Sequence, residues 1–362
     1  MLPVFSQSPR DPGFLADPWP AYARLRALGP AHWAELPHLT LVLSSHAEVS
    51  AALRDRRLGR EPPEKPNTPN HLSPFAALER HALLELEPPD HTRLRALVAR
   101  AFTSRAVAAW APRIDAIAHD LLDRVEGRPF DLVADYAEPL PLRVIAELLG
   151  AEPADAPRLR AWSAAMTAMY QARRSPQTER AAADASAEFA CYVRHLLAKR
   201  RAAPGDALLD RLIAARDGDD RLSEAELVST AVLLLNAGHE ATVLALALAA
   251  GLAMAGTIPP ATFAGPSGEA ALEEALRLAP PLHLFDRHVY QPLEIAGAPL
   301  APGDRVGLLL AAAGRDPAAI PEPDAARLDR PPAEGHLAFG AGLHFCVGAP
   351  LARLELRLGL AA

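Results

Sequence analysis

The sequence has few cysteines. Its 362 residues include only two, Cys191 and Cys346, which provide no framework of disulfide bonds. The N-terminus also lacks the basic segment followed by an apolar one that marks a secretory signal peptide. These two absences predict a protein of the reducing cytoplasm.

Internal repeats, polar low-complexity runs and linker-like stretches are also lacking. The length by itself suggests two or more domains. Because no boundary is visible, however, we expect a single domain over residues 1–362.

Strand-like stretches are few, and helical periodicity fills the rest of the chain. The strand candidates are LTLVL at 39–43, LEIAG at 293–297 and RVGLLL at 305–310, the last two pairing across the turn near Pro302 and Gly303. Helical spacing of i, i+3, i+4, i+7 and i+8 recurs in residues 94–102 and 114–122. The sequence predicts a mainly α fold with small β-sheets.

Lysine is almost absent, and the arginines are scattered among acids in a chain of net charge −7. This distribution gives no support to nucleic-acid binding. The most apolar run, residues 231–254, is long enough to cross a membrane, but Asn236, His239 and Glu240 lie in its middle. We therefore expect a buried helix with a function, and no membrane association.

The sequence does contain a cysteine in a glycine-broken loop, FGAGLHFCVGAPLARLEL at 339–356. A thiolate that serves as a single metal ligand needs backbone N–H groups, space for the ligand and exclusion of water. Gly342 and Gly348 let the backbone approach a flat ligand closely, and LARLEL predicts a helix whose N-terminus favours an anionic sulfur. Taken alone, the cysteine has a simpler interpretation, because most free cysteines are small buried hydrophobes.

The loop resembles the haem-binding loop of the cytochrome P450 family at every defined position, which are Phe339, Gly340, Gly342, His344, Cys346 and Gly348. The resemblance is to a soluble bacterial P450. It implies the P450 fold, with haem b between a long central helix and the cysteine loop. It also implies that Cys346 is the iron ligand, as in the P450 class of haem proteins.

Other segments occur in the order of that family. Glu274 and Arg277 form an ExxR motif on one helix face. Such a pair is usually solvated and of little energetic value, but the resemblance implies that it joins a further arginine, Arg327, to hold the core on the cysteine side of the haem. Residues 91–103 resemble the helix that crosses the haem edge. The residues that the resemblance assigns to the haem propionates are His91, Arg95, Arg287 and His344.

A capping-box pattern at residues 223–226 predicts a long helix that runs to about residue 254. Within it, residues 237–242 resemble the oxygen-binding signature of the family. Ala237 and Gly238 are small enough for haem and dioxygen to lie close. Glu240 is either a solvated acid or, next to the oxygen groove, a proton relay.

This chain departs from that signature in one position. The family has an alcohol directly after the acid, whereas this chain has Ala241. Thr242 is rotated by about 100° around the helix axis and does not simply substitute for it. We expect ordered water, or a hydroxyl of the substrate, to link Glu240 to the iron-bound oxygen.

Electrons come from outside the chain, because no flavin or nicotinamide fingerprint is present. The resemblance implies a ferredoxin with its reductase, which would dock on a positive face made of Arg93, Arg100, Arg105 and Arg353. We expect a medium-sized apolar substrate with one polar handle. Its predicted surroundings are a proline-rich lid at 60–75, Met166, Met169, Tyr170 and residues 282–285.

The sequence thus predicts a monomeric haem-thiolate monooxygenase that inserts one oxygen atom from O2 into an organic substrate. One alternative is a haem-thiolate peroxygenase or isomerase-type enzyme, which the missing alcohol at Ala241 leaves open. Another is a non-catalytic haem or gas-binding protein, which the short C-terminus leaves open. The chain ends soon after Cys346 and residues 255–272 are brief for the family, so we expect a truncated or naturally reduced protein.

Overall fold

The computed structural model describes residues 2–8, 10–36, 38–64, 67–171, 174–330 and 335–362. The chain forms two compact units. Unit 1 consists of residues 1–65 and 248–346, and unit 2 consists of residues 66–247 and 347–360. Of the last two residues, Ala361 is grouped with unit 1 and Ala362 with unit 2. The single domain expected from the sequence stays a prediction.

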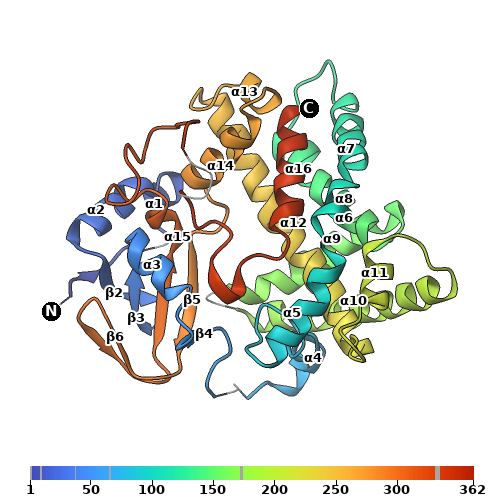
Figure 1. Ribbon diagram of the computed structural model, residues 1–362, viewed down its shortest axis with the longest axis horizontal. Helices are drawn as coiled ribbons and strands as arrows, with labels where there is room; N and C mark the ends of the chain where they lie inside the picture. Colours follow the sequence, from blue (N-terminus) through green and yellow to red (C-terminus); the bar gives the residue numbers. More distant parts are fainter. Residues whose placement is uncertain (1, 9, 37, 65–66, 172–173, 331–334) are drawn as a thin grey trace. The chain divides into compact units, whose positions relative to one another are not determined.

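Unit 1 contains a mixed sheet of six strands in the order β1-β2-β3-β8-β5-β4. Strand β3 pairs antiparallel with β2 and parallel with β8, and β5 pairs antiparallel with both β8 and β4. Figure 1 shows β2, β3 and β5 beside the helices α2 and α3. The strands are β1 (Val4–Phe5), β2 (Ala31–Leu36), β3 (His38–Leu43), β4 (Leu58–Gly59), β5 (Leu284–Val289) and β8 (Arg305–Leu309).

Both faces of this sheet carry a core. Leu41 and Leu43 of β3 pack in one cluster with Val49 of α3. Val42, between them, belongs to a second cluster with Tyr22 of α2. Successive side chains of a strand point to opposite faces, so burial on both sides explains the apolar run at 41–43, and the predicted strand at 39–43 is confirmed.

The predicted pairing of LEIAG with RVGLLL is wrong. Strand β6 (Leu293–Ile295) pairs with β7 (Ala298–Leu300) in a separate hairpin. The turn residues Ala296 and Gly297 both have positive φ, 50° and 81°, which is the turn geometry that matches the twist of a tight hairpin. The turn near Pro302 and Gly303 instead leads into β8, which lies between β3 and β5.

Helices complete unit 1. The described ones are α1 (Pro12–Ala16), α2 (Trp19–Leu28), α3 (His46–Ala52), α13 (Pro260–Ala264), α14 (Gly268–Leu278), α15 (Leu310–Ala313) and the 3-10 turn η5 (Gly342–His344).

Unit 2 is almost entirely helical in its described residues. Its elements are η1 (Asn70–Leu72), α4 (Ser73–Glu79), α5 (Asp90–Ala101), α6 (Ser104–Ala108), α7 (Ala111–Asp123), the π-helix η2 (Leu132–Ala137), α8 (Pro139–Leu149), η3 (Pro153–Asp155), α9 (Ala156–Thr167), η4 (Ala168–Tyr170), α10 (Pro176–Ala202) and α11 (Leu208–Ala214), with most of α12 (Glu224–Met254) and α16 (Ala349–Ala361). The prediction of a mainly α fold with small sheets is confirmed.

The local signals account for the long helices. The apolar positions of residues 94–101 and 114–121 are buried in α5 and α7. The capping box of α12 forms as predicted, because the Ser223 N–H donates to Glu226 Oε2 (2.7 Å) and the Glu226 N–H donates to Ser223 Oγ (3.3 Å). By length and composition α12 is also the one candidate membrane span among the described residues, with 44% of its most apolar window buried.

Candidate active site

The cysteine loop of unit 1 is closed by backbone hydrogen bonds. The Gly340 N–H donates to the Leu337 carbonyl (2.8 Å), and the Cys346 N–H donates to the Phe339 carbonyl (2.9 Å). The second bond ties Cys346 back to the start of its own motif. Cys346 itself is exposed, so its sulfur is accessible to a ligand.

Two glycines of the loop have a left-handed backbone, which side chains disfavour. Their φ values are 69° at Gly340 and 68° at Gly342. A Cβ atom at Gly342 would also lie 2.6 Å from the Leu53 carbonyl oxygen and 3.1 Å from Arg54 Cα. Gly342 is therefore required by a close approach to the loop after α3. Gly348 has an ordinary helical φ of −82° and is the N-cap of α16.

A buried ion pair in α14 supports the segment that precedes this loop. Arg277 and Glu274 are 1% and 4% exposed. Arg277 Nε and Nη2 donate to the two carboxylate oxygens of Glu274 at 2.7 and 2.8 Å. The remaining N–H groups of Arg277 donate to the carbonyls of Gly314, Pro323 and Ala325. Every donor of the guanidinium has an acceptor, which is what a buried arginine requires.

The third member of this network is Arg330, and the assignment of Arg327 was wrong. Arg330 Nε lies 3.3 Å from Glu274 Oε2. The Arg327 guanidinium instead pairs with the exposed carboxylates of Glu322 and Asp329, and only its backbone N–H donates to Glu274 (2.9 Å). Burial raises the pKa of Glu274, but these hydrogen bonds and charges outweigh burial and hold the pKa below its usual value.

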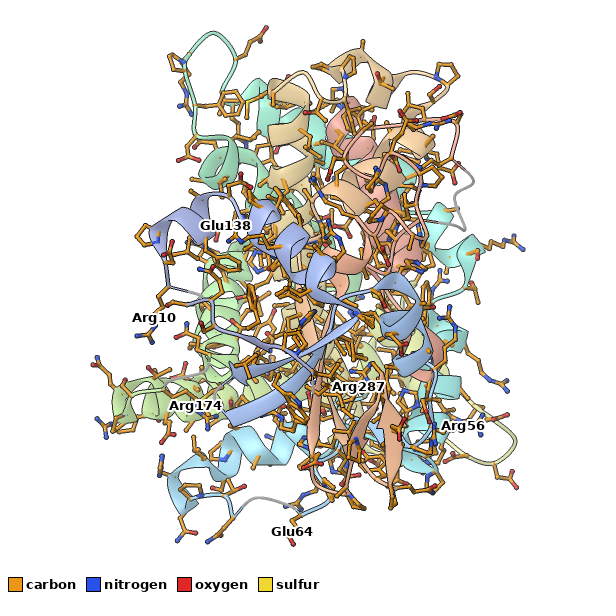
Figure 2. All side chains as sticks on the ribbon, turned by 90° about the vertical axis from the view of Figure 1, so that its left-hand side faces the viewer. Arg10, Arg56, Glu64, Glu138, Arg174 and Arg287 are labelled. Carbon is orange, nitrogen blue, oxygen red and sulfur yellow. The ribbon has the colours of Figure 1, made fainter. Side chains whose placement is uncertain are left out.

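The residues predicted to contact propionates belong to both units, two to each. In unit 2, His91 (0% exposed) and Arg95 are one turn apart on α5. In unit 1, Arg287 of β5 is 4% exposed and His344 lies in η5. Figure 2 shows Arg287 on its strand. Each unit thus contributes two of the four basic side chains.

One face of α12 is exposed although the helix is the most apolar of the chain. Ala237, Glu240, Leu244 and Leu248 are exposed at i, i+3, i+7 and i+11, with Leu244 at 46% and Leu248 at 39%. These spacings are those of one helix face. A face of this composition has the character of a surface that a flat apolar ligand covers.

The acid of this face has a partner on another helix. The Thr167 hydroxyl, in the last turn of α9, donates to Glu240 Oε1 at 2.5 Å. Gly238 and Ala241 are half-buried, and Thr242 is 6% exposed. Thr242 therefore lies on the buried side of α12, and the prediction that it does not replace an alcohol at position 241 is consistent with its burial.

His239 is also buried, at 5% exposed. Burial lowers the pKa of its imidazole, with the charge of Glu138 opposing the shift. Figure 2 labels Glu138, which precedes α8 in unit 2. Burial thus favours the neutral form of His239, whereas its neighbour in sequence, Glu240, is exposed.

The predicted substrate contacts separate into buried and exposed side chains. Met166 and Met169 are buried, whereas Tyr170 is 56% exposed and donates to Glu79. In unit 1, Leu282 and Leu284 are exposed. His283 is instead engaged by the Tyr22 hydroxyl (2.9 Å) and by Trp19. Of the predicted lid at 60–75, residues 65 and 66 lie outside the described residues.

The predicted positive docking face is partly neutralised. Arg93 pairs with Asp220 and Glu226, and Arg100 pairs with Asp217 at 2.5 Å. Arg105 is exposed and Arg353 is half-buried. Two of the four predicted arginines thus have acidic partners within unit 2.

Three parts of the site were missed by reasoning from the sequence. They are Thr167 beside Glu240, Arg330 beside Glu274, and a buried pair between His336 and Glu273 (2.9 Å) at the start of the cysteine loop. For the last, the sequence offers only position, since Glu273 adjoins the ExxR glutamate and His336 precedes Phe339 by three residues. A threonine remote in sequence carries no such signal.

The residues present fit haem as a ligand. Within the described residues, no group of three or more His, Cys, Asp or Glu side chains gathers to hold a metal. An iron held by a single cysteine would take its other ligands from a porphyrin. Within unit 1, the exposed Cys346 and Phe345 of the loop and the exposed Leu284 of β5 offer the thiol and apolar surface that such a group needs.

Comparison with known proteins gives concordant matches. The family model described as Cytochrome P450 matches residues 266–362. The cytochrome P450 monooxygenase PikC of Streptomyces venezuelae is 37% identical over 370 residues, covering 99% of this chain and 86% of PikC. The mycinamicin IV hydroxylase/epoxidase of Micromonospora griseorubida is 37% identical over 333 residues, covering 88% of this chain and 80% of that protein.

Among solved structures, one close match is P450BioI in complex with hexadec-9Z-enoic acid ligated acyl carrier protein. It superposes with a TM-score of 0.87 at 30% identity, covering 96% of this chain and 91% of that one.

Proposed function

Because the chain belongs to the cytochrome P450 family, in which it is a bacterial haem b monooxygenase, we propose that Cys346 is the thiolate ligand of the iron. The observation that carries this proposal is the exposed Cys346, whose N–H is held by the Phe339 carbonyl in a loop with two left-handed glycines. The loop follows the buried Glu274–Arg277 pair in the order that the family has.

When bound, haem supplies an iron that activates O2, with a thiolate ligand that favours O–O cleavage. The residues of the chain hold and surround that group. The residues that would donate to its propionates, as the resemblance to the family implies, are His91, Arg95, Arg287 and His344, since buried carboxylates need partners. The apolar face of α12 would exclude water from the cofactor.

Glu240 and Thr167 supply the proton that the reduction of O2 consumes. Glu240 is exposed on the face of α12 that carries Ala237 and Ala241, and the Thr167 hydroxyl lies 2.5 Å from its carboxylate. A proton that Thr167 donates to Glu240 is replaced from water at the threonine oxygen. Because Ala241 has no hydroxyl, ordered water or a hydroxyl of the substrate completes the path beyond Glu240.

The substitution Ala241→Thr tests that last link. If the native path is efficient, the added hydroxyl leaves the ratio of product formed to NAD(P)H consumed about unchanged. A large gain in this ratio in the variant would contradict an efficient native path.

The substrate we propose is a medium-sized apolar molecule with one polar handle. The apolar contact that supports this proposal is offered in unit 1 by Leu282 and Leu284, both 40% exposed. Electrons come from a ferredoxin and its reductase, and the protein acts as a monomer in the cytoplasm.

The test is the absorption spectrum of the reduced, carbon-monoxide-bound protein, followed by turnover with a ferredoxin system. We expect a thiolate-type band in the native protein and its loss in Cys346→Ser. A native protein that binds haem without this band would overturn the assignment of Cys346.

One observation keeps a second activity in view. The absence of a hydroxyl at Ala241 favours chemistry that does not need delivery of two protons to O2, such as use of peroxide. Product formed with hydrogen peroxide in place of O2 and the ferredoxin system, at a comparable rate, would favour the peroxygenase.

A further inference from the structure

A buried acid and base that the proposed chemistry does not use lie at the start of the cysteine loop. His336 Nε2 is 2.9 Å from Glu273 Oε2, and the two side chains are only 7% and 10% exposed. Glu273 lies on α14 directly before Glu274 of the ExxR pair. The helix that holds the Arg277 network therefore also holds the first residues of the loop.

The hydrogen bonds of His336 define which ring nitrogen carries the proton. The backbone N–H of Ala338 donates to His336 Nδ1 at 3.1 Å, so Nδ1 is the acceptor and Nε2 carries the hydrogen. Nε2–H then donates to Glu273. We assign the neutral Nε2–H tautomer on this basis. Glu273 is needed here as a hydrogen-bond acceptor, and its charge is not needed.

A short path leads from this imidazole to the cysteine. The His336 ring contacts the Phe339 ring, with centroids 5.9 Å apart, and the Phe339 ring contacts that of Phe345 at 6.4 Å. The Phe339 carbonyl accepts the Cys346 N–H. His336 thus fixes both the backbone at Ala338 and the aromatic ring of the residue that holds the cysteine amide.

We propose that His336, held by Glu273, is a positioning residue for the Cys346 thiolate. The proposal rests on Cys346 being the haem ligand. Without His336 the Ala338 N–H and the Glu273 carboxylate lose buried partners, which alters the loop even where the fold survives. The orientation and hydrogen bonding of a thiolate ligand set the reduction potential of its iron, so the pair is expected to act on that potential.

Two conservative variants separate the two hydrogen bonds. In His336→Asn the amide oxygen takes the place of Nδ1 and keeps the Ala338 contact, while in His336→Gln the amide nitrogen takes the place of Nε2 and keeps the Glu273 contact. For each of these two variants, we expect a reduction potential and a rate of haem loss between those of the native protein and those of His336→Leu. Glu273→Gln keeps an acceptor without charge and is expected to match the native protein, unlike Glu273→Leu.

The matched control is His32→Leu. His32 is a fully buried histidine of unit 1, with Nε2 bonded to the Gly29 carbonyl at 2.9 Å, and it lies on β2, remote in sequence from the loop. We expect His32→Leu to lower the thermal midpoint, because a buried hydrogen bond is lost there too. We expect it to leave the reduction potential and the thiolate-type band of the haem-bound protein unchanged.

Two measurements decide the proposal. In the haem-bound protein, His336→Leu and Glu273→Leu should shift the reduction potential and raise the rate of haem loss about tenfold, with Asn and Gln at position 336 intermediate. In the haem-free protein, ¹⁵N spectra of the His336 ring should show the Nε2–H tautomer. Native potential and haem retention in both leucine variants, equal shifts in His32→Leu, or the Nδ1–H tautomer would overturn the proposal.

Failure of the positioning role of His336 can be distinguished from failure of Cys346 as the haem ligand. A native protein without a thiolate-type band would remove the proposed ligand, and with it this role of His336, whatever the variants do. A native protein that shows the band, with a potential insensitive to His336 and Glu273, would leave the ligand in place and reject the positioning role alone.

Discussion

The Glu240 carboxylate is hydrogen-bonded to the hydroxyl of Thr167, although the next residue in sequence, Ala241, has no hydroxyl. The Thr167 hydroxyl donates to the Glu240 carboxylate, yet the Ser163 carbonyl also lies 2.9 Å from the same hydroxyl oxygen. A hydroxyl has one hydrogen to donate and lone pairs to accept with. Thr167 therefore donates to an ionised Glu240, and accepts from a protonated one while it donates to Ser163.

Removal of this hydroxyl should uncouple the enzyme. We expect Thr167→Val to lower the product formed per NAD(P)H consumed by about tenfold, because a hydrogen bond to a charged group is lost. Thr167→Ser keeps the hydroxyl and is the matched control. The measurement is product yield against NAD(P)H consumption, with the solvent isotope effect on turnover. Native coupling and an unchanged isotope effect in the valine variant would exclude Thr167 from the proton path.

Gly342 combines two constraints that can be tested apart. Its left-handed φ costs an alanine about 1–2 kcal/mol, and its Cβ would also meet the Leu53 carbonyl oxygen at 2.6 Å. Gly297, in the β6–β7 turn, has a similar φ of 81° but nothing within 4 Å of a Cβ. Gly297→Ala therefore measures the backbone cost alone.

We expect Gly342→Ala to lower the free energy of unfolding by more than Gly297→Ala and to reduce the haem bound per chain. Denaturant unfolding and haem quantification on both variants are the measurements. Equal losses of stability, with full haem content in Gly342→Ala, would show that the clash with Leu53 relaxes without effect on the loop.

Among the elements, α16 carries an unusual buried acid. Glu355 is 3% exposed, and no partner is found for its Oε2 among the described residues. Burial raises the pKa of this carboxyl well above the ordinary value of 4.5. The folded protein therefore holds a proton that the unfolded chain releases. The stability that Glu355 contributes is complete below pH 4.5 and falls as the pH rises toward the raised folded pKa.

Replacement by an amide should remove this pH dependence. We expect Glu355→Gln to match the native protein below pH 4.5 and to exceed its stability at neutral pH, by about 1.4 kcal/mol for each pH unit above 4.5 until the raised folded pKa is reached. Thermal unfolding at acidic and neutral pH is the measurement. The exposed Glu294 of β6 provides the control Glu294→Gln. A stability difference independent of pH would contradict a neutral Glu355.

The sequence predicted those elements whose signals are local. The period of residues 94–101, the capping box of Ser223 and Glu226, and the order of the motifs around Cys346 all depend on neighbours in the chain, and α5, α12 and the loop form as expected. The wrong predictions concern choices between distant partners. Arg327 and Arg330 have the same side chain, and which of the two guanidinium groups reaches Glu274 depends on how residues 322–330 fold back on α14.

The same limit explains the strand pairing. Residues 293–297 could be joined to either of two following strands, and the backbone of Ala296 and Gly297 selects the nearer one. Thr167 lies far from Glu240 in sequence, so only the packing of α9 against α12 brings the hydroxyl to the carboxylate. Distant pairings of this kind carry no period or spacing from which they could be predicted.

For the whole molecule, the exposed apolar side chains predict how haem affects stability. Leu244, Leu284 and Phe345 are large, 39–46% exposed, and belong to segments proposed to contact haem. Since burial of apolar surface stabilises by about 25 cal/mol per Å², and a ligand at 100 times its Kd stabilises by about 2.7 kcal/mol, haem should raise the thermal midpoint by several degrees.

Calorimetry with and without haem is the measurement. Leu244→Asp should reduce this increase, whereas Leu28→Asp, at a 57% exposed position that ends α2, should not. Equal increases in both variants would exclude this face of α12 from haem contact.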